Sequence, residues 1–118
     1  MSELESKTFA QPDQIRSFEK GKLELVTLGG VTFGRATLQP GWKWSTSVKP
    51  LVNTESCQAS HLQYHLSGRL HVVMEDGSEH DLVQGDVSLI PPGHDAWVVG
   101  DEPVVILDIV GMAEYAKK

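Results

Sequence analysis

The stretch that decides the fold is residues 68–93, GRLHVVMEDGSEHDLVQGDVSLIPPG. Within it, Leu70, Val72 and Met74 alternate with other residues, which predicts a half-buried strand. Asp76-Gly77 then predicts a tight hairpin, because both central positions of a type I′ turn need positive φ. The return strand SEHDLV leads to a corner at QGD, and the next strand is DVSLI. This strand ends at PPG, because proline cannot donate a hydrogen bond to a β-ladder. The stretch therefore predicts short antiparallel strands joined by tight turns.

The same pattern continues on both sides of this stretch. We expect further strands at 22–28, 31–38, 57–68, 95–99 and 104–110, with a looser segment at 43–56. The last run, VVILDIV, is apolar on both faces and therefore belongs in the middle of a packed sheet. About eight short strands with tight turns predict an all-β sandwich or barrel.

The chain of 118 residues is expected to form one domain with its own core. Residues 1–21 are polar and are expected to form an N-terminal arm, with one helical turn at PDQIRSFEK (12–20). The β-domain is expected to span residues 22–112, and residues 113–118 are expected to form a C-terminal tail.

Composition and charge exclude several classes of protein. One cysteine cannot form an internal disulfide, and a free thiol suits a reducing compartment. We find neither a basic signal-peptide region nor an apolar run of membrane-spanning length, so we expect a cytoplasmic protein with no membrane partner. Sixteen acidic and ten basic residues give a net charge of −6, and the basic residues are scattered, so we expect no nucleic-acid partner.

Two segments resemble the motifs of the cupin family. Gly85, DVSLI and Pro91-Pro92-Gly93 resemble the second cupin motif, a glycine followed five residues later by Pro-any-Gly, and Gly68 matches the closing glycine of the first motif. PGWKWS, VKP, SC, LSGRLHV and IPPGHDAWVVGDEPVV together resemble a branch of small stand-alone bacterial cupin-domain proteins. The resemblance implies a single-domain cupin barrel, a double-stranded β-helix or jelly roll, with a short N-terminal arm.

The resemblance also implies where a metal would be bound. Cupins typically hold a divalent metal inside the barrel through two histidines spaced by one residue, a glutamate shortly after, and a histidine past the second motif. Counting back from Gly68 places His61 at the glutamate position, Cys57 at the second histidine position and Glu55 at the first.

Two departures from the family pattern accompany this alignment. Counting forward from Gly41 instead places Ser47 and Lys49 at the two histidine positions, so the chain carries an insertion around PLVNTE (50–55). Past the second motif the usual histidine position holds Ala96, while His94 lies two residues earlier and on the same side by strand parity. None of the usual ligands is therefore at its standard position.

The candidate metal ligands are Cys57, His61 and His94, with Glu55 as a weaker fourth. Thiolate and neutral imidazole suit zinc and other late first-row ions, so zinc, iron, manganese and nickel are the candidate metals, and no organic cofactor is indicated. The alternatives are a buried core thiol at Cys57 and a turn histidine, solvated or hydrogen-bonded to its neighbour, at His94.

Strand parity divides the residues of the opening strand between two faces. Cys57, His61, Gln63 and His65 share one face, and Leu62, Tyr64 and Leu66 share the other. Further candidates for lining a pocket are an aromatic rim, a carboxylate-binding arginine and a lysine in the loop: Trp42, Trp44, Trp97, Arg35 and Lys49. Trp42 and Trp44 are expected to share a strand face, and the alternatives for the three tryptophans are barrel packing or a dimer contact. His71 and His80 are expected at the surface.

These features leave two functions open. The first is a metal-dependent enzyme acting on a small molecule, of lyase, isomerase or oxygen-dependent type, with an atypical Cys/His metal site. The alternative is a non-catalytic ligand-binding or sensing cupin without bound metal. Since cupins commonly pair through the outer face of a sheet, the resemblance also implies a homodimer with Leu62, Tyr64 and Leu66 as contact candidates.

Overall fold

The structure, a computed structural model, describes residues 4–52 and 60–110. Strands dominate the described residues, and both helices are single turns. The elements are β1 Gln14–Phe18, β2 Gly21–Leu28, β3 Val31–Leu38, α1 Trp44–Ser47, α2 Lys49–Val52, β4 His61–Ser67, β5 Arg69–Met74, β6 Glu79–Leu82, β7 Val87–Ile90, β8 His94–Val99 and β9 Val104–Val110. The all-β prediction is confirmed.

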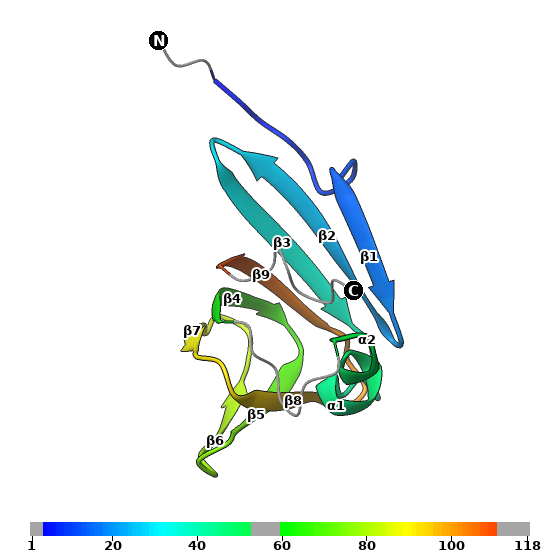
Figure 1. Cartoon of the computed structure of the whole chain (residues 1–118), viewed down its shortest axis with the longest axis vertical. Coiled ribbons are helices and arrows are strands. Elements are labelled where there is room, and N and C mark those ends of the chain that lie inside the picture. The colour runs from blue at the N-terminus through cyan, green and yellow to red at the C-terminus, as the bar shows by residue number, and fades with distance from the viewer. Residues whose placement is uncertain (1–3, 53–59, 111–118) are drawn as a thin grey trace.

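The strands form two antiparallel sheets. The larger sheet has six strands in the order β1-β2-β3-β9-β4-β7, and the smaller has three in the order β6-β5-β8. Figure 1 shows the long β2–β3 hairpin at one end of the molecule and β5, β6 and β8 at the other. Strand β9 lies between β3 and β4 and pairs with both, which confirms that the run VVILDIV occupies the middle of a sheet.

The first strand corrects the expectation of a helical turn at residues 12–20. Residues 14–18 instead form β1, which pairs with β2 from Gln14 opposite Leu25 to Phe18 opposite Gly21. Arg16 and Phe18 are half-buried while their neighbours are exposed, which is the period of a strand and not of a helix. The free edge of β2 supplies backbone partners that an isolated helical turn lacks. The expected C-terminal tail at 113–118 lies outside the described residues.

The core lies between the two sheets. It is built from alternate positions of the strands, such as Leu38 on β3, Val72 on β5 and Ile106 on β9. Phe18 of β1 and Met74 of β5 pack against its margin. Because inward positions alternate with outward ones, strand parity decides which side chains reach the interior.

A membrane-spanning helix is absent from the part of the chain that the structure describes.

The corner between β4 and β5 packs closely against the backbone at the start of β9. Gly68 has φ +78°, and a Cβ built there would lie 2.5 Å from the carbonyl oxygen of Pro103. Gly77, in the β5–β6 hairpin, has φ +91° but no atom within 4 Å of the same position. Both turns require the left-handed region, and the first also requires the absence of a side chain.

We predict that Gly68→Ala destabilises the protein more than Gly77→Ala. The Gly77→Ala variant should have an unfolding free energy roughly 1–2 kcal/mol lower than the wild type, because alanine disfavours the left-handed backbone at this position. The Gly68→Ala variant has the same backbone cost, and its new methyl group must also displace the Pro103 backbone. Its unfolding free energy should therefore be lower than that of Gly77→Ala by at least about 1 kcal/mol. Urea denaturation of both variants measures the difference. Equal losses would contradict the close approach of Gly68 to Pro103.

Candidate functional site

A small cavity lies between the two sheets. Its volume is about 30 Å³, enough for one or two water molecules. Aliphatic side chains of β3, β5, β7, β8 and β9 form most of its wall. The lining residues that carry nitrogen in their side chains are Trp42, Trp44, His61, Gln63 and His94. The cavity is therefore an apolar chamber with a few polar groups, which is the usual composition of a small-molecule site.

His61 begins β4 and is held by a buried carboxylate. Its Nδ1 lies 2.6 Å from Oδ2 of Asp108, which is on β9 and is fully buried. The carboxylate accepts the bond from Nδ1–H, so the neutral ring carries its lone pair on Nε2. Carboxylates fix the orientation of metal-binding histidines in this way.

His94 begins β8 and is held in the same tautomer by the backbone. Its Nδ1 lies 2.9 Å from the carbonyl oxygen of Pro91, and a carbonyl can only accept. Nδ1 is therefore the donor, and the neutral ring carries its lone pair on Nε2. The centroids of the His61 and His94 rings are 5.3 Å apart, with the rings edge to face. The structure thus brings together two of the residues expected at the site.

Two further lining groups are buried donors. Nε1 of Trp42 and Nε2 of Gln63 have no hydrogen-bond partner among the described residues, although both side chains are buried. Leaving a buried donor unpaired costs roughly 1–3 kcal/mol. Native structures rarely leave such groups unpaired, so their presence in one cavity is a sign of an occupant.

His65 points inward from β4 but is not among the described residues that line the cavity. Its Nε2–H donates to the carbonyl oxygen of Gly68 at 3.0 Å. Burial lowers the pKa of His65, and the bond to Gly68 opposes this shift only in part. The neutral form of the ring is therefore favoured, and its hydrogen bond to Gly68 stabilises the corner between β4 and β5.

Trp42 and Trp44 both line the cavity, but they do not share a strand face. Trp42 lies in the connection after β3 and Trp44 is the first residue of α1. The strand ends earlier because Gly41, with φ +92°, follows Pro40 and turns the chain.

The prediction that Trp97 belongs to an aromatic rim is wrong. Its neighbours Ala96 and Val98 on β8 are buried inward, so Trp97 faces outward by parity. Its ring lies 4.9 Å from that of His71, and Nζ of Lys43 lies 4.9 Å from its centroid.

Arg35 and Lys49 do not contribute to the cavity either. Arg35 adjoins the inward-facing Ala36 on β3 and faces the other side, where its Nε donates to Oε1 of Glu24 at 3.0 Å. Arg35 was predicted to bind the carboxylate of a ligand, but it is paired with the carboxylate of Glu24 instead. Lys49 begins α2 and is not among the described residues that line the cavity.

Cys57 and Glu55 lie outside the described residues, as does the second half of the insertion predicted around 50–55. Within residues 4–52 and 60–110, no group of three or more histidine, cysteine, aspartate or glutamate side chains is placed to hold a metal ion. His61 and His94 are thus the described part of the predicted ligand set. Both are imidazoles with a hydrogen-bonded Nδ1, and imidazole is a usual ligand of zinc and other transition metals.

Asp108 is the site residue that the sequence interpretation missed. It lies within VVILDIV, which was interpreted as a uniformly apolar run. The signal was its parity, because Val104, Ile106 and Asp108 share the inward face of β9. A carboxylate at a buried position needs a partner, and a histidine across the sheet supplies one.

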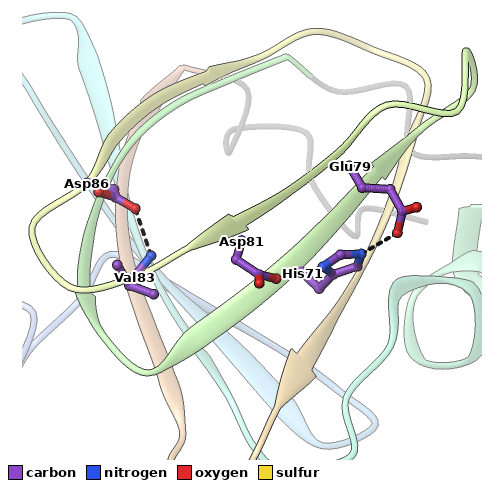
Figure 2. Close-up of polar contacts among 5 residues, drawn as sticks. All are labelled: His71, Glu79, Asp81, Val83 and Asp86. Carbon is purple, nitrogen blue, oxygen red and sulfur yellow. Dashed lines mark hydrogen bonds and ion pairs between the residues drawn. The ribbon is translucent and has the colours of Figure 1, made fainter.

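A second histidine site lies on the β5–β6 hairpin. Nδ1 of His71 is 2.6 Å from Oδ1 of Asp81, and Nε2 is 2.6 Å from Oε1 of Glu79. Figure 2 shows the ring between these two acidic side chains, and Asp86 capping the backbone of Val83 in the next turn. Both ring nitrogens donate, so the arrangement favours the imidazolium. The bonds to Asp81 and then Glu79 raise the pKa of His71 above its ordinary 6.5.

We predict that His71 stabilises the fold more at acidic than at alkaline pH. Because the folded pKa of His71 lies above its unfolded value, the stabilisation is fully present below about pH 6.5 and is lost as the pH rises through the folded pKa. Urea denaturation of the wild type and His71→Gln across this range measures it. The stability difference should shrink with rising pH, and a difference that grows instead would contradict the pairing.

Comparison with known proteins supports the fold. No protein-family model matches the chain, and a search of curated proteins also gives no match. A protein of unknown function from Rhizobium leguminosarum bv. viciae 3841 superposes with a TM-score of 0.66 at 22% identity, covering 92% of this chain and 97% of its own.

Two further solved structures carry more descriptive names. The polyketide cyclase RemF from Streptomyces resistomycificus has a TM-score of 0.63 at 12% identity, over 92% of this chain and 79% of its own. A cupin-like protein from Thermotoga maritima has a TM-score of 0.56 at 16% identity, over 82% of this chain and 73% of its own. The similar structures thus include both an enzyme and a protein of unknown function. Together with the two-sheet topology, they show that this chain has the cupin fold.

Proposed function

We propose that the cavity is a metal-dependent small-molecule site in which Nε2 of His61 and Nε2 of His94 bind a divalent ion. The observation that supports this most strongly is the pair of anchored imidazoles. Asp108 and the Pro91 carbonyl each accept from an Nδ1–H, which gives both neutral rings the tautomer that binds metal through Nε2. A single histidine held in this way is common in cores, whereas two in one apolar cavity suit an ion.

We propose Cys57 as the third ligand and Glu55 as the weaker fourth. Their positions in the sequence are those of the missing ligands in the cupin pattern, four and six residues before His61. An imidazole and thiolate set favours zinc, with iron, nickel and manganese as further candidates.

The residues of the chain have separable roles in this proposal. Asp108 orients His61, and the Pro91 carbonyl orients His94. The aliphatic wall lowers the local polarity, which strengthens the polar contacts inside the cavity. A bound divalent ion would act as a Lewis acid on an oxygen atom of the substrate. Lyase and isomerase chemistry, or oxygen-dependent chemistry, fits such a site, and the enzyme among the similar structures is consistent with a catalytic role.

Metal content per chain tests this proposal. We predict that protein purified without a metal-chelating tag holds close to one ion per chain, measured by mass spectrometry, and that His61→Ala and His94→Ala each lose it. Asp108→Asn keeps both imidazoles but removes the charged acceptor, so its metal affinity should fall roughly 10- to 100-fold. Cys57→Ala tests the third ligand.

His80→Ala is the matched control, because His80 is an exposed histidine on β6 and should leave the metal content unchanged. A folded wild type without metal, or metal that persists in both cavity variants, contradicts the proposal. The first of these outcomes favours the alternative, a ligand-binding or sensing cupin without metal.

We also propose that the protein forms a homodimer through the outer face of the larger sheet. Tyr64 and Leu66 of β4 are 42% and 37% exposed, and Val87 and Leu89 of the edge strand β7 are 71% and 73% exposed. Leu62, the other predicted contact, is half-buried beside Leu89. A contiguous apolar face of this kind suits a self-complementary contact.

Sedimentation equilibrium measures the state of association. We predict a dimer for the wild type and a monomer for Leu89→Glu, since a charge on this apolar face opposes its burial. Val31→Glu, at an exposed apolar position on the distant β2–β3 hairpin, is the control and should remain dimeric. A monomeric wild type would contradict the proposal.

A further inference from the structure

We propose that Trp42 and Gln63 together hold the oxygen atom of a small uncharged carbonyl compound in the cavity. The inference rests on the proposed function for its location, because both use the same cavity. It does not depend on the metal, since neither donor belongs to the proposed ligand set. The ligand class would be aldehydes, ketones, esters or amides.

Trp42 and Gln63 are the two cavity-lining residues among the five described residues with a buried side-chain polar atom that lacks a hydrogen-bond partner. Trp42 is 3% exposed and Gln63 is 4% exposed, and both line the cavity. Nε1 of Trp42 and Nε2 of Gln63 have no hydrogen-bond partner within the described part of the chain. The indole nitrogen can only donate. Whichever way the Gln63 amide is turned, the occupant must therefore bring an acceptor.

The charges around the cavity favour an uncharged acceptor. No lysine or arginine is found among the described residues that line it. Arg35 is paired with Glu24 on the other side of the sheet, and the carboxylate of Asp108 already lies behind His61. A ligand carboxylate would lose its hydration without gaining a cationic partner from these residues, which makes its burial unfavourable. A carbonyl oxygen accepts two hydrogen bonds and carries no net charge.

The wall around the donors matches the rest of such a ligand. Leu38, Leu70 and Ile106 contribute apolar surface to the same cavity. Its volume of about 30 Å³ admits only a head group without displacement of side chains. A compound with one carbonyl and short apolar substituents therefore suits the chamber better than a polar or extended one.

Acetone is a suitable probe, and acetate is its charged counterpart of similar size. The experiment uses ¹⁵N-labelled full-length protein treated with a chelator and follows the indole and side-chain amide resonances. The chain has three tryptophans, so Trp42→Phe assigns the Trp42 indole signal by its disappearance. We expect acetone to shift the Trp42 indole and Gln63 amide protons downfield in a saturable manner, and acetate to leave them in place.

Two variants separate recognition from structure. Gln63→Met keeps the length of the side chain and removes the donor, so it should weaken the apparent affinity for acetone about threefold to tenfold, as judged from the Trp42 signal. The same variant should raise the melting temperature of the unliganded protein, because a buried unpaired group is removed. Trp97→Phe is the control outside the cavity and should leave the acetone response unchanged.

Three results would overturn the inference. They are an unmoved Trp42 signal with acetone, a response to acetate in place of acetone, and a Gln63→Met variant that binds acetone as the wild type does. An acetone response in a protein that binds no metal would refute the metal proposal alone. Metal binding without an acetone response would refute the donor pair alone.

Discussion

The hydrogen bond between Asp108 and His61 is the constraint on which the site depends. A carboxylate in the middle of a sheet loses its hydration, a cost of several kcal/mol that only strong hydrogen bonds offset. Asp108 meets this condition through His61 at 2.6 Å, because β9 and β4 are neighbours in the larger sheet. The backbone of the fold thus decides the tautomer of the imidazole that faces the cavity.

The protein uses the same pair of residue types for a different purpose on its surface. His71 also lies 2.6 Å from an aspartate, but Asp81 and Glu79 are exposed and bond to opposite ring nitrogens. Two acceptors favour the charged ring and raise the pKa of His71. His61 has a buried aspartate at Nδ1, and its second nitrogen belongs to the cavity side of the ring in our proposal. The burial of the acceptor distinguishes the two histidines, because Asp108 is buried whereas Glu79 and Asp81 are exposed.

Turn chemistry made most of the fold predictable from the sequence. Asp76-Gly77 and the stop at Pro91-Pro92-Gly93 are local signals, and the expected strands from residue 22 onward correspond to β2–β9. Parity within β4 also placed His61 and Gln63 on the buried face. β1 was missed because its pairing depends on the free edge of β2, which is a property of the assembled sheet.

The site was less predictable for the same reason. Asp108 becomes informative only when His61 is known to lie across the sheet, and the unpaired donors of Trp42 and Gln63 become visible only when the cavity is closed around them. Trp97 was placed in the cavity by its chemistry, and Arg35 because it shares a strand face with Val31 and Phe33. The buried faces of β8 and β3 are the opposite ones, so both side chains face away from the cavity. Residue type indicates what a side chain can bind, and its position in the sheet determines whether it faces the cavity.

The most direct test of this account is the tautomer of His61 and of His94. The ¹⁵N chemical shifts of the two imidazoles report it in metal-free protein near neutral pH. A metal site organised by Asp108 and the Pro91 carbonyl requires a protonated Nδ1 and an Nε2 lone pair in both rings. Addition of Zn²⁺ should then shift both Nε2 resonances and leave both Nδ1 atoms protonated. An Nε2–H tautomer in either ring, or Nε2 resonances of the folded protein that Zn²⁺ leaves unmoved, would contradict it.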